Sequence, residues 1–339
     1  MASAVATPEL TAFPIPTDRY EVLEPIRTGM SLFKARAYDH ENDQQVFIKA
    51  EKPESENAAS RLMREADIYE SLDHPQVPRL LDSVRNDDFA YIATEFMPGS
   101  RSLPNRLKAR GPKPVLVARL CLSALEVLDY VHAQGFVHRD VKTPNFLMQT
   151  AGVASLADFG IARHMDSGDD IEKTAEADVR RRIADTAITH SSDFAGTPSY
   201  TSPEQLMGVK VSAQSDVYGV GTMLHELLDG QLPFLSAGET TIRGNELASR
   251  KFLPHEGHFW QNQRVIPGAL KFIVLRALEP NLANRYASAA EMGEDLRRYL
   301  ASACRAPRTY SGRQQTGENI TPTDTATTQK ISGIVLQPA

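Results

Sequence analysis

A short window of the sequence gathers side chains that suit chemistry with a divalent cation. Residues 137–148 read VHRDVKTPNFLM and place Asp140, Lys142 and Asn145 within six positions. A further aspartate, Asp158, opens the tripeptide Asp-Phe-Gly thirteen residues after Asn145. Carboxylate and amide oxygens are the ligands that Mg²⁺ prefers, and a positioned carboxylate can also accept a proton. This combination of residue types predicts a polar catalytic loop.

Other landmarks occur before and after this window in a fixed order. They are Val46-Phe47-Ile48-Lys49, Arg64-Glu65-Ala66, GTPSYTSPEQ at residues 196–205, Asp216-Val217-Tyr218-Gly219-Val220-Gly221 and Arg285. Together with the window and Asp158-Phe159-Gly160, they closely resemble the motifs of protein kinases. Residues 196–205 resemble the end of the activation segment in bacterial Hanks-type serine/threonine kinases. The resemblance covers about residues 20–302.

The resemblance implies an α+β, bilobal protein kinase fold and a protein serine/threonine kinase activity. By this resemblance, Asp140 would accept the proton of the substrate hydroxyl, and Lys142 would bind the γ-phosphate of ATP. Asn145 and Asp158 would hold Mg²⁺. Lys142 and Thr197 resemble the serine/threonine-specific pattern, so the expected substrates are proteins that offer serine or threonine hydroxyls.

The resemblance also assigns a nucleotide pocket to the first part of the chain. Lys49 would hold the α- and β-phosphates of ATP, and Glu65 would orient Lys49 through a salt bridge. The remaining positions expected to contact ATP are Ile26, Gly29, Phe47, Glu95 and Met97.

Two departures from the family's pattern leave alternatives open. Only Gly29 remains where the family has a glycine-rich loop, and Arg27 replaces the usual first glycine. Phe47 replaces a small alanine, and it should share the cleft face with Lys49 because strand side chains alternate. A pseudokinase scaffold is therefore one alternative. A small-molecule kinase of the aminoglycoside-phosphotransferase type is another, but it would lack the segment 196–204. We expect an active enzyme, because all the charged motif residues are present. We expect its affinity for ATP to be weakened by the two departures.

The elements that must position these residues fall into two lobes. Residues 19–97 form the expected N-lobe, in which YEVLEPI, QQVFIKA and FAYIATEF are rich in β-branched and aromatic residues. A helical stretch at about residues 58–72 interrupts these strands. Residues 98–302 form the expected C-lobe, which is mainly helical. Its strongest helix spans residues 115–132, where apolar residues recur at three- and four-residue spacings.

Composition excludes several classes of protein. The 339 residues carry 37 basic and 43 acidic side chains, so no basic footprint favours nucleic acid as a partner. No stretch reaches the roughly 18 apolar residues of a membrane helix, and the N-terminus does not resemble a secretory signal. Two cysteines make no disulfide framework, so we expect a cytoplasmic protein. Residues 1–18 are expected to be a flexible leader, and residues 303–339 a disordered, threonine-rich tail.

Two sets of hydroxyl side chains are expected to be modified. Arg139 precedes Asp140, and in kinases with this arginine a phosphate on the activation segment typically pairs with it. We expect autophosphorylation at Thr189 or Ser191. Threonines of the tail are further acceptors that would recruit phosphothreonine-reader proteins.

Overall fold

The structure, a computed structural model, describes residues 18–28, 32–51, 56–87, 89–97, 101–102, 113–149, 152–165, 197–207, 211–235, 250–251, 260 and 265–305. Most of the expected leader and tail lies outside these residues, as do Gly29, Thr189 and Ser191. The chain divides into two units, residues 1–304 and 305–339. The fold set out below is that of the first unit.

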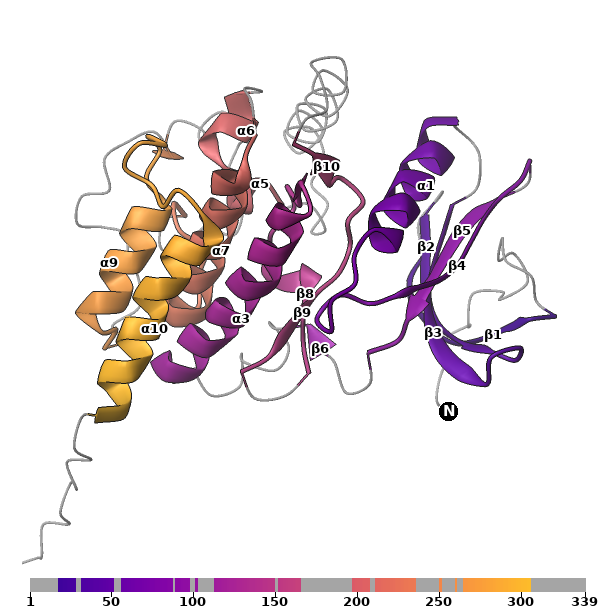
Figure 1. The fold of residues 1–339 in the computed structure, drawn as a ribbon, viewed down its shortest axis with the longest axis horizontal. Coiled ribbons are helices and arrows are strands. Elements are labelled where there is room, and N and C mark those ends of the chain that lie inside the picture. The colour runs from indigo at the N-terminus through magenta and orange to yellow at the C-terminus, as the bar shows by residue number, and fades with distance from the viewer. Residues whose placement is uncertain are drawn as a thin grey trace, which may run out of the picture. The chain divides into compact units, whose positions relative to one another are not determined.

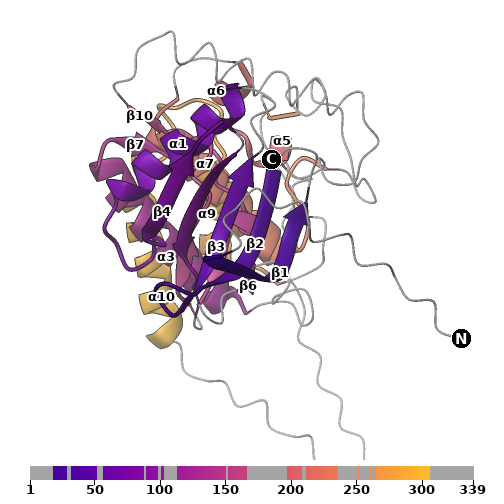
Figure 2. The ribbon, with the colours of Figure 1, turned by 90° about the vertical axis from the view of Figure 1, so that its right-hand side faces the viewer.

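An antiparallel sheet forms the N-terminal lobe (Figures 1 and 2). Its five strands follow the order β1-β2-β3-β5-β4 and span Tyr20–Thr28 (β1), Leu32–Asp39 (β2), Gln44–Glu51 (β3), Leu80–Arg85 (β4) and Ala90–Glu95 (β5). Side chains alternate between the two faces, and along β2 every second residue from Phe33 to Asp39 is buried. One face therefore carries a small apolar cluster that includes Ala35, Ile48 and Tyr91.

Helix α1, Glu56–Glu70, packs against strands β3, β4 and β5 of this sheet. Leu62, Ala66 and Tyr69 lie buried on the helix face toward the core, at three- and four-residue spacings. The helix begins two residues before the expected start and ends two residues before the expected end. Such differences are usual, because the last turns of a helix depend on local capping rather than on apolar spacing.

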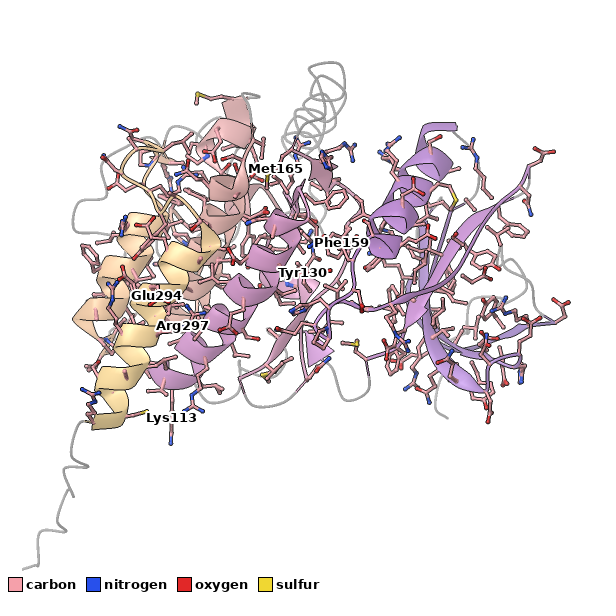
Figure 3. The ribbon with its side chains drawn as sticks, in the orientation of Figure 1. Lys113, Tyr130, Phe159, Met165, Glu294 and Arg297 are labelled. Atoms are coloured by element: carbon pink, nitrogen blue, oxygen red, sulfur yellow. The ribbon has the colours of Figure 1, made fainter. Side chains whose placement is uncertain are left out.

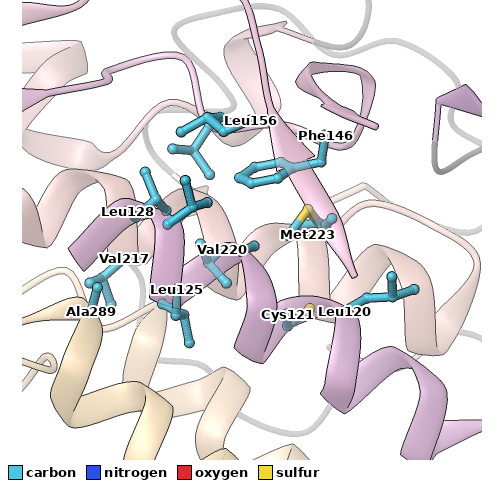
Figure 4. Packing of buried hydrophobic residues seen from close by; sticks show 14 of the residues in the cluster. Leu120, Cys121, Leu125, Leu128, Phe146, Leu156, Val217, Val220, Met223 and Ala289 are labelled. Atoms are coloured by element: carbon cyan, nitrogen blue, oxygen red, sulfur yellow. The ribbon is translucent and has the colours of Figure 1, made fainter. Parts of the chain in front are cut away.

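The helical lobe is built around α3, Pro114–Ala133, and α7, Ala213–Asp229. These two helices pack against each other, and α7 also packs against α9, Gly268–Ala277. Figure 4 shows the buried apolar side chains at this contact, namely Leu120, Leu125, Leu128, Phe146, Leu156, Val217, Val220 and Met223. Helix α3 confirms the predicted stretch 115–132 to within one residue at each end. Pro114 starts it, and a proline is tolerated there because the first N–H groups of a helix have no helical partner.

Two glycines allow α7 to approach its neighbours closely. A Cβ atom on Gly219 would lie 2.6 Å from the Cβ of Val141, next to the catalytic loop. A Cβ atom on Gly221 would lie 2.6 Å from the Cβ of Ala277 in α9. Both separations are shorter than packed carbon atoms allow. The glycines of the Asp-Val-Tyr-Gly-Val-Gly motif thus bring α7 against the catalytic loop and against α9.

Helix α10, Ala289–Arg305, corrects the expected start of the tail at residue 303. Residues 303–305 continue this helix. Leu300 and Ala303 pack against the core of the helical lobe, so the last turn has apolar contacts to stabilise it. Alanine also has the highest helix propensity, which favours the continuation of the helix. The part of the expected tail beyond residue 305 lies outside the described residues.

Short elements hold the loops at the boundary between the lobes. The catalytic loop runs from β7, Phe136–Val137, through the 3-10 helix η2, Thr143–Asn145, into β8, Phe146–Met148. Strand β9, Ala154–Leu156, pairs with β8 and leads to Asp158. The remaining short elements are β6, Arg101–Ser102; β10, Arg163–His164; α5, Thr197–Tyr200; and α6, Pro203–Met207. Within the described ranges, no helix is long and apolar enough to cross a membrane.

Candidate active site

A cavity of about 460 Å³ is lined by the sheet of the N-terminal lobe and by the catalytic loop. Its walls include nine of the residues that the sequence predicts to bind nucleotide, metal or phosphate. These are Ile26, Phe47, Lys49, Glu65, Glu95, Met97, Lys142, Asn145 and Asp158. Asp140 contacts two members of this set, Lys142 and Asn145. The structure therefore brings the predicted site residues together wherever it describes them.

Lys49 lies between two carboxylates at the back of this cavity. Its Nζ is 2.5 Å from Oε2 of Glu65 on α1 and 3.0 Å from Oδ1 of Asp158. Burial alone would lower the pKa of Lys49, but the two carboxylates outweigh it and raise the pKa above its ordinary value. Gly160 allows this cluster to close, since a Cβ atom there would lie only 3.1 Å from Lys49 Nζ. The cluster links β3, α1 and the loop after β9.

Asp158 has a second cationic partner that the sequence analysis did not assign. Nζ of Lys34 on β2 lies 2.7 Å from Oδ2 of Asp158. Burial opposes ionisation of Asp158, yet Lys49 and Lys34 together hold its pKa well below the ordinary value. The backbone of Asp158 has a positive φ of 69°, and its N–H donates to the hydroxyl of Tyr69 at 3.0 Å. The carboxylate of Asp158 is therefore ionised. The backbone that carries it is strained and is held by the hydrogen bond to Tyr69.

The catalytic loop joins Asp140, Lys142 and Asn145 by direct hydrogen bonds. Nζ of Lys142 lies 2.7 Å from Oδ2 of Asp140. The amide nitrogen of Asn145 donates to the same Oδ2 at 3.1 Å and to the backbone carbonyl of Asp140 at 2.9 Å. These bonds hold the carboxylate in one orientation and direct the amide nitrogen of Asn145 toward it.

Asp216, at the start of α7, holds the backbone of this loop. Its carboxylate accepts the N–H groups of His138 and Arg139, each at 2.8 Å, and contacts Nε2 of His132 at 2.8 Å. Burial opposes ionisation, but the contact with His132 and the other partners lower the pKa of Asp216. Arg139 adopts a positive φ of 69°, and Gln205 donates to its carbonyl oxygen at 2.9 Å. The carboxylate of Asp216 thus stabilises the strained backbone beside Asp140.

His138 is a packed histidine. It is fully buried, and burial lowers its pKa. Its ring lies 4.9 Å from the ring of Phe159, which in turn lies 5.1 Å from the ring of Tyr69 in α1. Figure 3 shows Phe159 between the helical lobe and α1. The three rings form a continuous series of edge-to-face contacts from the catalytic loop to the N-terminal lobe.

The donor set fits a nucleotide with a divalent cation. Lys34 and Lys49 supply positive charge for phosphates, and Asn145 and Asp158 supply hard oxygen atoms for Mg²⁺. The apolar part of the cavity suits the adenine ring of a nucleotide. Its lining includes Ile26, Phe47, Ile92, Met97 and Leu147. Phe47 faces the cavity, as the strand alternation predicts.

Comparison with known proteins identifies the family to which this fold and site belong. A family model described as the protein kinase domain matches residues 20–295. The chain therefore belongs to the protein kinase domain family. This match and the observed lobes confirm the expected α+β bilobal kinase fold.

The similar curated proteins are bacterial serine/threonine kinases. The chain is 30% identical over 283 residues to a Clostridium perfringens protein described as a probable serine/threonine-protein kinase, covering 82% of this chain and 38% of that protein. It is 30% identical to serine/threonine-protein kinase PknB of Mycobacterium leprae, covering 85% and 44%, and of Mycobacterium tuberculosis, covering 83% and 42%. The predicted resemblance to bacterial Hanks-type serine/threonine kinases is confirmed. The chain spans less than half the length of these relatives.

Several cavity residues were missed by the sequence analysis. Lys34, Tyr69, Thr94 and Leu147 all line the cavity. The signal for Lys34 was present in the alternation of β2, where the residues that flank it are buried on the opposite face. The register of β2 against β3 was needed to place it above Asp158, and this register is not visible in the sequence.

Proposed function

We propose that this chain transfers the γ-phosphate of ATP to serine or threonine hydroxyls of protein substrates. The observation that carries the proposal is the hydrogen-bonded group of Asp140, Lys142 and Asn145 beside a cavity that Lys49 and Asp158 also line. Phosphoryl transfer depends on positioning and on neutralisation of charge rather than on covalent help from the protein. This arrangement supplies a carboxylate base and two cationic groups within one cleft.

Asp140 is the proposed base. Its Oδ2 accepts hydrogen bonds from Lys142 and Asn145, which fix the direction of the carboxylate. Asp140 would orient the substrate hydroxyl and accept its proton as the hydroxyl oxygen bonds to the γ-phosphorus, while the bond from that phosphorus to the ADP oxygen breaks. Lys142 would neutralise charge on the transferring group.

The other predicted residues would bind the nucleotide and its cation. Lys49, fixed by Glu65, would hold the α- and β-phosphates. Asn145 and Asp158 would hold Mg²⁺, which when bound neutralises phosphate charge. The remaining proposed ATP contacts are Ile26, Gly29, Phe47, Glu95 and Met97. Nothing in this arrangement favours the pseudokinase alternative, because each charged motif residue has a partner suited to its role.

Transfer of radiolabelled phosphate by the purified chain tests the proposal. Myelin basic protein and an aminoglycoside are offered as acceptors in parallel. We expect label on the protein, and we expect Asp140→Asn to lower its rate by about 10²–10⁴-fold while nucleotide binding persists. Lys113→Met, an exposed change at the start of α3 (Figure 3), should leave the rate unchanged. Label on the aminoglycoside alone, or ATP binding without transfer, would overturn the proposal.

Phosphorylation of Thr189 or Ser191 is the proposed means of activation. The phosphate would pair with Arg139, whose backbone is fixed by Asp216 and Gln205 beside Asp140. Mass spectrometry of the active chain should find phosphate on residues 186–192, and the Asp140→Asn variant should carry none there. Active protein without phosphate on these residues would contradict the proposal.

The proposed function also implies partners and a location in the cell. Protein substrates are one class of partner, and phosphothreonine-reader proteins recruited by the threonines beyond residue 305 are the other. One observation supports the proposed cytoplasmic location: Cys121 and Cys304 are free thiols. The proposed division of the kinase domain sets the N-lobe at residues 19–97 and the C-lobe from residue 98 to the end of α10 at residue 305.

A further inference from the structure

We propose that Lys34 is a second phosphate-binding lysine of the nucleotide cleft, and that its side chain supplies contacts that a glycine-rich loop would otherwise make. This inference rests on the proposed function, since it assigns a ligand contact within the same cleft. The sequence analysis assigns no ligand to Lys34.

Strand register places Lys34 beside Lys49. The two residues are direct cross-strand partners in the antiparallel pair β2–β3. Directly opposed residues point to the same face of a sheet. Phe33 and Ala35, which flank Lys34, are buried in the apolar cluster on the other face. Both lysines accordingly line the cavity.

The charges around Asp158 show which lysine is able to move. Opposed like charges destabilise a sheet unless anions lie between them. The carboxylate of Asp158 lies between the two lysines. Its Oδ2 is 2.7 Å from Nζ of Lys34, and its Oδ1 is 3.0 Å from Nζ of Lys49. Lys49 is also held by Glu65 and its side chain is 9% exposed, whereas the side chain of Lys34 is 19% exposed. Lys34 is therefore the lysine that can leave Asp158 for another anion.

The sequence from the end of β1 to the start of β2 explains why a further cation is needed. Backbone N–H groups approach phosphates closely where glycines leave space, and residues 26–34 contain only Gly29. A lysine donates up to three hydrogen bonds from a flexible stem. If Oδ2 of Asp158 held Mg²⁺, the ammonium group of Lys34 would leave that oxygen and would then bind the β- or γ-phosphate.

Calorimetric titration with ATP, ADP and adenosine in the presence of Mg²⁺ tests the role of Lys34. Lys34→Met should weaken the binding of ATP and ADP at least tenfold and change the affinity for adenosine less than twofold. Lys34→Arg, which keeps the charge, should retain most of the affinity for ADP. Lys113→Met removes an exposed lysine far from the cleft and should change none of the three affinities (Figure 3). Thermal unfolding confirms that each variant is folded before titration.

Two results overturn the proposal for Lys34. One is an unchanged affinity for ADP in folded Lys34→Met. The other is an equal loss of affinity for ADP and adenosine, which would mean that Lys34 maintains the shape of the cleft rather than contacts phosphate. A wild-type chain that binds no nucleotide would overturn the kinase function as well, so the two failures are distinguishable. If Lys34→Met does not fold, Lys34→Gln takes its place in the same comparison.

Discussion

Arg285 pairs with Glu204 through two parallel contacts, 81 residues apart in the sequence. Its Nη1 lies 2.7 Å from Oε1 of Glu204, and its Nη2 lies 3.1 Å from Oε2. Ser215 donates to the same Oε1 at 2.6 Å, and Arg285 also donates to the carbonyl oxygens of Gln214 and Glu279. The pair joins the end of the activation segment to α7 and to the loop before α10.

Loss of the cation should destabilise the fold strongly. Arg285→Met would leave the buried carboxylate of Glu204 without its main partner, which typically costs about 3–5 kcal/mol. Denaturant unfolding followed by circular dichroism measures this loss. Arg298→Met, an exposed change in α10, is the matched control and should change the free energy of unfolding by less than about 0.5 kcal/mol. Equal stability of the two variants would show that the pair contributes little.

The same pair should give stability that depends on pH. Burial opposes ionisation, but Arg285 outweighs it and lowers the pKa of Glu204. Folding therefore favours the ionised form, so this stability is present above the ordinary glutamate pKa of about 4.3 and is lost as pH falls through the lower folded value. The melting temperature of Glu204→Gln should lie well below that of wild type at pH 7. The gap should narrow below about pH 4, and a gap that widens on acidification would contradict the prediction.

Gly160 offers a test of the cluster at the back of the cleft. An added methyl group would lie 3.1 Å from Lys49 Nζ and 3.3 Å from carboxylate oxygens of Asp158 and Glu65. These contacts are tighter than usual, so Gly160→Ala should displace the cluster and lower the transfer rate about tenfold, since small misplacements in an active site are costly. Gly268→Ala, where nothing lies within 4 Å of the new methyl group, is the matched control. Equal rates for both variants would show that the cluster tolerates the displacement.

The sequence predicted the parts of the fold that depend on local pattern. Apolar residues at helical spacing gave α3 within one residue at each end. Strand β2 was not among the predicted runs, because its cleft face carries Lys34 and Arg36 and its buried face carries small alanines. Short strands such as β8 were missed as well, since three residues are too few for a periodic signal.

The candidate site was predicted by motif order, and its geometry was not. The order of Lys49, Glu65, Asp140 and Asp158 indicated which side chains converge. The ion pair between Lys34 and Asp158 joins residues 124 positions apart, and it depends on the β2–β3 register and on the approach of the two lobes. Local sequence carries no signal for such a contact.

Phe47 should limit the affinity for adenine nucleotides. Its ring lines the cavity beside the other apolar residues and takes space that a base would use. Phe47→Ala should therefore tighten ATP binding about three- to tenfold, equivalent to roughly 1 kcal/mol, in a calorimetric titration. Phe272→Ala removes the same ring at an exposed position of α9 and should leave the affinity unchanged. Weaker binding by Phe47→Ala would show instead that the ring packs on the base.

Two hydroxyl groups and one carboxylate connect the catalytic loop to the end of the activation segment. Thr143 Oγ1 donates to Oε2 of Glu226 in α7 at 2.8 Å, and it lies 2.6 Å from the hydroxyl of Tyr200. Tyr200 also donates to the same oxygen of Glu226. Burial, reinforced by Glu226, raises the pKa of the Tyr200 hydroxyl well above its ordinary value, so it remains a donor. The network fixes α5 relative to η2, where a protein substrate would approach Asp140.

Tyr200→Phe should therefore affect the protein substrate more than the nucleotide. The variant keeps the ring and loses hydrogen bonds worth about 0.5–1.5 kcal/mol each. With myelin basic protein as acceptor, we expect its KM to rise about three- to tenfold and the KM for ATP to change less than twofold. Tyr130→Phe is the matched control, because its hydroxyl accepts the N–H of Asp73 at 2.8 Å and Figure 3 shows it on α3. A similar rise in both variants, or a rise in the KM for ATP alone, would show that the Tyr200 hydroxyl does not position the acceptor.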